Sequence, residues 1–208
     1  TGVSLIRKSK KTSAGIERTV NFVTINSMAM EEVNRGNSCY LCFEAQEAVQ
    51  SIHEQLNRNK NKEETAPFVL QHFPTFRTSD ERCIDTNSEN NAQFREKWET
   101  LSRDSTNFIA QMLQPRAYFS GHTHHYCLHE NDDGIKEYTL ASFNWRNINN
   151  PSFVLGIFTP TDYSISRCDM PKESTVILCY VIGSLLAMIL VLVETQIFKR
   201  TVPKSNVE

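Results

Sequence analysis

Two histidines in the sequence form a Gly-His-x-His motif, Gly121-His122-Thr123-His124, and this motif follows a strand-like segment. Neutral imidazole is a frequent ligand of divalent metals in catalytic sites. A glycine at the end of a strand lets the backbone turn sharply, so His122 and His124 can point into one cleft. The motif therefore predicts part of a metal site.

A third candidate ligand, His72, lies just after the apolar run at residues 67–70. Pro74 fixes a turn two positions later, so the chain leaves the strand in a defined direction. In α/β proteins, sites form where the carboxyl ends of strands meet. We therefore expect a second loop to bring His72 to the edge of the sheet that carries His122 and His124, and we predict that these three residues are metal ligands.

Other polar residues have weaker claims to a functional role. His125 directly follows the ligand pair, and it either orients a ligand, contacts phosphate, or does neither. His53 is expected on a helix and His129 in a hairpin arm, so both are predicted to be structural. Residues 144–146, Asn-Trp-Arg, either line a glycan or phosphate pocket or form a loop anchored by a packed tryptophan; the second interpretation is favoured.

The elements that must position these residues alternate between strand and helix patterns. Strands are expected at residues 20–25, 67–70 and 116–120, helices at 43–58 and about 92–113, and hairpins at 126–129 with 136–140 and 152–158 with 161–167. Residues 78–91 are expected to form a polar loop. This order predicts a layered α/β sandwich.

Composition and charge exclude several classes of protein. The 208 residues are 39% hydrophobic and 22% charged, with 7 Gly and 7 Pro, which excludes collagen-like and wholly disordered chains. The net charge of −2 provides no global attraction to nucleic acid, so no nucleic-acid partner is predicted. The basic run between Arg7 and Arg18 could form a phosphate or lipid patch, but we interpret it as a solvated loop because no aromatic residues lie among its charges.

One segment has a composition unlike the rest. Residues 175–193 contain no charged side chain, and a helix of this length covers about the 30 Å of a bilayer core. A buried core helix is the alternative, although core helices are seldom apolar around their whole circumference. We predict a transmembrane helix at residues 174–194, a lumenal domain at 1–173 and a cytosolic tail at 195–208, since Lys199, Arg200 and Lys204 follow the helix.

The cysteines are consistent with a lumenal location. Cys39 and Cys42 form a Cys-x-x-Cys motif, which could be half of a zinc site, a redox pair, an ordinary disulfide or two buried thiols. No second such motif is present, so a disulfide or buried thiols are favoured. Other disulfides are possible, but the sequence does not assign their pairing. Thr1 replaces an initiator methionine and no signal segment follows it, so the sequence is interpreted as a fragment or a processed piece.

Two motifs carry a resemblance to a known family. VLQHFP at residues 69–74 and FSGHTHHY at 119–126, with a helix between them, resemble the C-terminal half of a calcineurin-like metallophosphoesterase. NFVTINSMA at residues 21–29, YTLASFNWRN at 138–147 and the late membrane helix resemble the eukaryotic metallophosphoesterase 1 group of that superfamily. The resemblance implies a four-layer α/β/β/α sandwich, of which this chain is the C-terminal part, with two divalent metal ions, in this group usually Mn²⁺.

The resemblance also implies an activity and a location. The metallophosphoesterase 1 group removes a side-chain ethanolamine phosphate from the second mannose of GPI anchors, and its substrates are GPI-anchored proteins. This removal supports the export of those proteins from the endoplasmic reticulum to the Golgi. The catalytic domain would be lumenal, on the membrane of endoplasmic reticulum exit sites, the intermediate compartment and the cis-Golgi. The membrane helix would hold the site near a lipid-linked substrate.

The resemblance transfers to individual residues only in part. His72 and His122 match family ligands to one metal, and His124 matches a ligand to the other. The family also needs an Asp-x-His, a Gly-Asp and an Asn-His upstream, and none occurs between Thr1 and Gln71. The isolated chain is therefore expected to be inactive, without a catalytic residue of its own. The alternatives are a non-catalytic, membrane-anchored binding module and a phosphoesterase acting on another phosphodiester.

Overall fold

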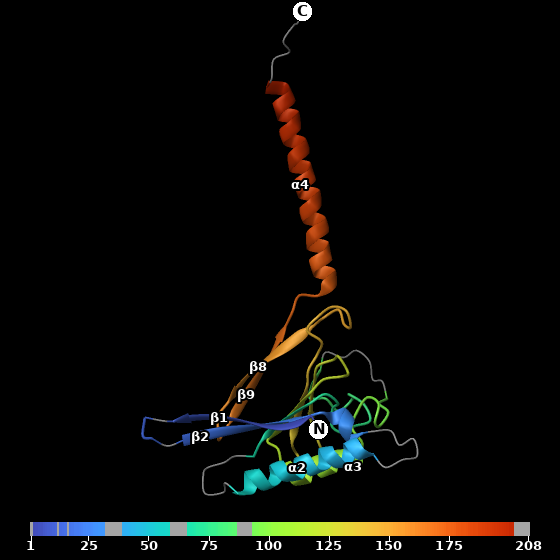
Figure 1. Ribbon diagram of the computed structural model, residues 1–208. Helices are drawn as coiled ribbons and strands as arrows, with labels where there is room; N and C mark the ends of the chain where they lie inside the picture. Colours follow the sequence, from blue (N-terminus) through green and yellow to red (C-terminus); the bar gives the residue numbers. More distant parts are fainter. Residues whose placement is uncertain are drawn as a thin grey trace, which may run out of the picture.

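The structure is a computed structural model, and it describes residues 2–11, 13–15, 17–31, 39–58, 66–86 and 93–201, with the side chains of 198–201 outside the description. It is a mixed α/β fold around one sheet, as predicted (Figure 1). The strands of this sheet, in spatial order, are β1 (Val3–Lys11), β2 (Glu17–Ile25), β3 (Phe68–Gln71), β5 (Ala117–Ser120), β7 (Lys136–Thr139), β6 (Cys127–Glu130) and β4 (Asp85–Thr86). Strands β2, β3, β5 and β7 run parallel, so their carboxyl ends share one edge.

Alternation along the central strands supplies both faces of the sheet with a core. Val69 and Tyr118 face the helices α2 (Tyr40–Arg58) and α3 (Arg103–Leu113), which cover one face together with the short helix α1 (Ser27–Met30). Their sequence neighbours Phe68 and Phe119 face the opposite side. There they pack against the hairpin of β8 (Ser152–Phe158) and β9 (Tyr163–Asp169), with Phe68 and Phe158 ring centroids 4.7 Å apart. The described residues thus form layers of helix, sheet and hairpin.

Two predictions about local structure were wrong. The predicted helix at 92–113 begins only at Arg103, because the Ser102 side chain accepts a hydrogen bond from the Ser105 N–H and caps the first turn. The residues just before it form turns instead. The basic run is not wholly a loop: residues 7–11 belong to β1 and Arg18 belongs to β2, and these strands pair antiparallel. Val3 and Leu5 at the start of β1 pack on the core, while its lysines face water.

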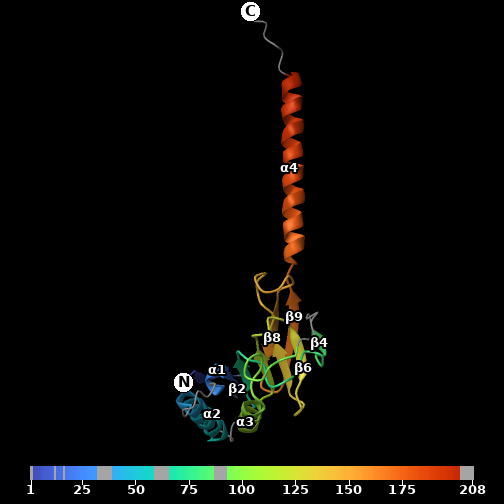
Figure 2. The ribbon, with the colours of Figure 1, turned by 90° about the vertical axis from the view of Figure 1, so that its right-hand side faces the viewer.

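The C-terminal helix α4 (Glu173–Thr201) projects away from the sandwich (Figures 1 and 2). Its stretch Glu173–Ile197 is long and apolar enough to cross a membrane, and no part of its apolar window is buried in the structure. This confirms the predicted apolar helix, and the residues that the structure describes do not bury it in a core. The helix leaves the hairpin within a few residues of the end of β9.

Disulfides account for four cysteines. Cys39 pairs with Cys42 at the start of α2, and Cys83 pairs with Cys127, which joins the segment before β4 to β6. Cys168 and Cys179 are free thiols. The Cys-x-x-Cys motif is therefore a disulfide in this structure. Paired cysteines suit an oxidising compartment.

Candidate metal centre

The loops after β3 and β5 lie side by side. Because these two strands pair in parallel, the residues that follow them leave the same edge of the sheet. The backbone N–H of Gly121 donates to the carbonyl of His72 at 3.0 Å, which holds the two loops together. The prediction that His72 and the Gly-His-x-His motif meet at one edge is confirmed.

His72 and His122 face each other directly. Nδ1 of His122 lies 3.1 Å from Nε2 of His72, and the ring centroids are 5.0 Å apart. The ring of Phe73 packs edge-on against His122, with centroids 4.3 Å apart, and limits its rotation. His122 adopts a left-handed backbone with φ of 70°, which turns its imidazole back toward His72.

This pair fits two ligands of one divalent ion. Metal–nitrogen bonds of about 2.0–2.1 Å at tetrahedral or octahedral angles separate two ligand nitrogens by about 2.8–3.4 Å. The observed separation of 3.1 Å falls in that range. Two imidazoles do not complete a catalytic ion, which takes about three protein ligands. The first aspartate of the chain is Asp80, so residues 1–79 supply no aspartate to bridge two ions.

The other ring nitrogen of His122 is also engaged. Nε2 lies 2.7 Å from the carbonyl oxygen of Trp98, which can only accept, so Nε2 is the protonated nitrogen of the neutral ring. Nδ1 is then left with its lone pair toward His72. Orientation of a ligand histidine by a backbone carbonyl is a common arrangement at metal sites. Trp98 thus contributes to the candidate centre through its backbone.

Electrostatics favour the neutral, ligating form of His122. Burial lowers the pKa of His122, and the nearby imidazoles of His72 and His124 lower this pKa further. The Trp98 carbonyl and the Glu99 carboxylate act in the opposite direction. The net shift of the His122 pKa is downward from its ordinary value of 6.5, so the ring becomes charged at a lower pH than an unperturbed histidine does. A neutral imidazole is the form that binds a metal.

His124 is oriented by a different segment. Its Nδ1 lies 2.8 Å from Oγ of Ser142 and 3.2 Å from Nδ2 of Asn147, and its carbonyl accepts from the Ser142 N–H. Its backbone is left-handed as well, with φ of 65°. Because an amide nitrogen only donates, Nδ1 accepts and Nε2 carries the proton of the neutral ring. Ligation of a metal through Nε2 would require this proton to move to Nδ1, which would then donate to Oγ of Ser142. The structure therefore pairs His72 with His122 and ties His124 to the loop between β7 and β8.

Two of the remaining histidines are structural, as predicted. His53 on α2 bonds Met112 of α3 and Asn57, and His129 is buried in β6, so both are structural. His125 is half-buried, and its Nδ1 has no hydrogen-bond partner among the described residues. Its proposed contact with phosphate or with a ligand residue stays a prediction.

Sequence reasoning missed Glu137, which ties both ligand loops to β7. Its buried carboxylate accepts from the backbone and hydroxyl of Thr75, three residues after His72. It also accepts from Oγ of Ser120, at 2.8 Å, just before the Gly-His-x-His motif, and it pairs with Arg77. A glutamate in a short alternating strand has no sequence signal that distinguishes it from an exposed residue. Its role became visible only through these contacts.

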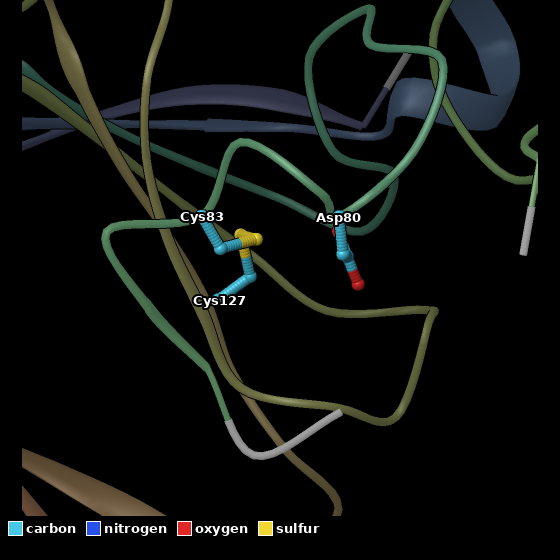
Figure 3. Close-up of side chains that lie close together, drawn as sticks. All are labelled: Asp80, Cys83 and Cys127. Atoms are coloured by element: carbon cyan, nitrogen blue, oxygen red, sulfur yellow. A yellow bond between two sulfur atoms is a disulfide. The ribbon is translucent and has the colours of Figure 1, made fainter. Parts of the chain in front are cut away.

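One further cluster has the composition of a metal site but not its chemistry. Asp80, Cys83 and Cys127 place their ligand atoms within 4.8 Å of one another (Figure 3). The two sulfurs are bonded to each other, so no thiolate is available to a metal. The Asp80 carboxylate pairs with Arg77, at 2.8 Å. This cluster is structural.

Curated relatives bear on the resemblance inferred from the motifs. The metallophosphoesterase 1 homolog of Drosophila melanogaster is 38% identical over 185 residues, which are 84% of this chain and 49% of that protein. The chain is homologous to metallophosphoesterase 1. Metallophosphoesterase 1 of Xenopus laevis is 39% identical over 80% of the chain, and that of Mus musculus is 38% identical over 85%, covering 45% and 48% of those proteins.

The extent of these matches limits what they show. The chain spans about half the length of the metallophosphoesterase 1 proteins that it matches. No family model matches the chain. Among solved structures, GAP50, the anchor in the inner membrane complex of Plasmodium, is matched with a TM-score of 0.42 and 9% identity, over 82% of this chain and 55% of that one. This likeness is too low to support a statement about the fold.

Proposed function

We propose that the chain supplies His72, His122 and His124 to the metal centre of a divalent-metal-dependent phosphoesterase. The observation that carries this proposal is the 3.1 Å separation between the His72 and His122 ring nitrogens. The homology to metallophosphoesterase 1 supports the reaction class. The centre would be completed by carboxylate and histidine ligands that the motifs of this chain do not include.

The residues of the chain would position the metal ions and set the protonation of the imidazole ligands. Bound divalent ions supply a hydroxide near neutral pH and stabilise charge on the phosphodiester oxygens. His72 and His122 would hold one ion through Nε2 and Nδ1, and the Trp98 carbonyl accepts from the protonated Nε2 on the far side of His122. His124 would hold the second ion through Nε2, with its proton moved to Nδ1 and donated to Oγ of Ser142.

The finer proposal concerns the metal and the substrate. We propose two Mn²⁺ ions, and removal of the side-chain ethanolamine phosphate from the second mannose of GPI anchors, in support of export of GPI-anchored proteins to the Golgi. The family resemblance motivates these details. The apolar helix α4 supports a membrane-linked substrate, because it would confine the site to the bilayer surface. The disulfides support a lumenal domain in the early secretory pathway.

A specific observation favours a second candidate function. No aspartate occurs before Asp80, so residues 1–79 contribute no bridging aspartate to a dinuclear centre. A chain that acts with these residues alone would be a membrane-anchored binding module with an incomplete centre. The two candidates differ in whether added upstream ligands restore hydrolysis.

A chimera tests the proposal. The part of the Drosophila metallophosphoesterase 1 homolog that lies outside the matched region is fused to this chain, and metal content and hydrolysis of bis(4-nitrophenyl) phosphate are measured with Mn²⁺ present. We expect hydrolysis by the chimera and at least about a hundredfold loss in His122→Ala. His53→Ala is the matched control, since the His53 ring bonds Met112 of α3 and Asn57 of α2, neither of which lies in the two ligand loops. Equal turnover in His122→Ala and the parent chimera would exclude the proposed centre.

The substrate is tested separately. GPI glycans from cells that express the chimera are analysed by mass spectrometry for ethanolamine phosphate on the second mannose. Loss of this group with the parent chimera, and its retention with His122→Ala, is the expected result. If the chimera hydrolyses the synthetic diester but leaves the GPI glycans unchanged, the proposed phosphoesterase activity stands and the proposed GPI substrate is refuted.

A further inference from the structure

The loop between β7 and β8, residues 140–151, is fastened to the first turn of α4. The carbonyl and side-chain oxygens of Asn149 accept from the backbone N–H groups of Glu173 and Ser174. The indole N–H of Trp145 donates to the Pro171 carbonyl at 3.0 Å. Both views of the ribbon show the loop beside the start of α4 (Figures 1 and 2). The loop and the helix start therefore form one local unit.

Aromatic side chains of this unit are exposed. Phe143 is 63% exposed and Trp145 is 36% exposed, and both lie in the loop. Phe153, at the start of β8, is 37% exposed and packs edge-on against Phe143, with ring centroids 5.6 Å apart. Exposed apolar groups that gather in one place usually mark a contact surface. Here the surface adjoins the start of an apolar helix.

The position of α4 fixes the depth of this loop in a membrane. The uncharged run begins at Thr175, so Glu173 and Ser174 lie where the hydrocarbon core ends. The headgroup layer outside the core is about 5–8 Å thick on each side. Because the loop bonds residues 171–174 directly, it lies at the level of the headgroups. Tryptophan is enriched at that level, since its ring is apolar and its N–H is polar.

Charges on the same unit match this location. Arg146 in the loop and Lys172 before α4 are both exposed. Basic side chains next to a membrane helix are attracted to lipid phosphates. The aromatic rings and these two cations thus offer apolar and ionic contacts to the same layer of lipid.

We propose that residues 143–146, together with Phe153, form a contact surface for the bilayer, seated in the lipid headgroup layer. The proposal rests on α4 spanning the membrane, and it is independent of any catalytic activity. It adds a second contact of the domain with lipid beyond the helix. Because Ser142 and Asn147 of the loop also bond His124, this surface adjoins the candidate metal centre.

Fluorescence quenching in the full 208-residue chain tests this surface. Trp98→Phe leaves Trp145 as the sole tryptophan, and the protein is reconstituted in phosphatidylcholine nanodiscs with bromine on the acyl chains near the glycerol. We expect the emission of Trp145 to fall about twofold or more relative to unbrominated nanodiscs. The control has Trp98→Phe, Trp145→Phe and Tyr40→Trp, which places the only tryptophan on α2, at the far end of the domain from α4 (Figure 1). Its emission should not change.

A tryptophan at a second position in the loop shows whether the result depends on the folding of one variant. Phe143→Trp in a Trp98→Phe, Trp145→Phe background reports from the more exposed ring, and circular dichroism checks each variant against the parent. Quenching at both positions, with none at position 40, supports the surface. Emission at positions 143 and 145 that is as insensitive to bromine as at position 40 would overturn it, because a loop seated among the headgroups lies within reach of the bromine atoms.

Discussion

His72 and His122 lie 50 residues apart in the sequence, yet Nε2 of one and Nδ1 of the other approach to 3.1 Å. Two opposed lone pairs at this distance repel, so in the metal-free chain one of the rings carries a proton between them. A divalent cation can replace that proton. Because Nδ1 of His122 holds a lone pair, that proton lies on Nε2 of neutral His72, and metal binding requires it to move to Nδ1 of His72.

Metal binding should depend on both rings. We expect Co²⁺, titrated calorimetrically into the 208-residue chain at pH 7.5, to bind at least about tenfold more weakly to His72→Ala and to His122→Ala. His53→Ala should bind as the parent does, because His53 is engaged between α2 and α3. Affinities that are the same in all four proteins would show that the two loops hold no metal.

Glu137 should affect both stability and metal affinity. Glu137→Gln removes one of the two carboxylate charges that pair with buried Arg77 and weakens the bonds to Thr75 and Ser120. We therefore expect a loss of about 3 kcal/mol in the free energy of unfolding in urea. Since those bonds hold both ligand loops, Co²⁺ affinity should fall in conditions where the variant is fully folded. Exposed Glu130→Gln in β6 is the control. Unchanged affinity in folded Glu137→Gln would restrict this residue to a structural role.

Acid should destabilise the domain partly through His129. Burial lowers the pKa of His129 below its ordinary 6.5, and Arg77 lowers this pKa further, while Glu137 opposes both. Above pH 6.5 the residue is neutral in both states and contributes nothing. As the pH falls through 6.5, the unfolded chain binds the proton first, so stability decreases until the folded-state pKa is passed. Melting temperatures should therefore drop less between pH 7 and 5 in His129→Gln than in the parent; parallel curves would contradict this.

The two disulfides should differ in their contribution to stability. Cys83 and Cys127 are 44 positions apart. Closing a loop of this length lowers the entropy of the unfolded chain, which stabilises the fold by about 4 kcal/mol. Cys39 and Cys42 are separated by 3, which corresponds to about 1.6 kcal/mol. We expect chemical denaturation to show the larger loss for Cys83→Ser/Cys127→Ser than for Cys39→Ser/Cys42→Ser. The reverse order would indicate that the short disulfide stabilises α2 by direct contacts.

The sequence predicted elements wherever apolar periodicity was unbroken. Helix α2 was expected because apolar residues recur at three- and four-residue intervals, and Ala45, Val49 and Ile52 are indeed buried. The start of α3 was misplaced by about eleven residues because apolar Phe94 and Trp98 extend the helical pattern upstream, while the cap at Ser102 outweighs it. The strand β1 was missed because exposed basic residues dominate it, and only Val3 and Leu5 at its start pack on the core.

The candidate centre was predictable only through its side-chain ligands. The histidines were recognisable because imidazoles at strand ends are typical of metal sites. The Trp98 carbonyl was not, since any residue provides one and only the turn before α3 brings this one to His122. Glu137 was not predictable either, because its partners Thr75 and Ser120 come from other strands' ends.

The left-handed backbones of His122 and His124 have a consequence for engineering this chain. Each such conformation costs a non-glycine residue of the order of 1 kcal/mol or more. A search for heat-resistant variants would therefore select glycine or asparagine at both positions and would discard two imidazoles in doing so. Selection for thermal stability alone would therefore remove two of the three candidate metal ligands.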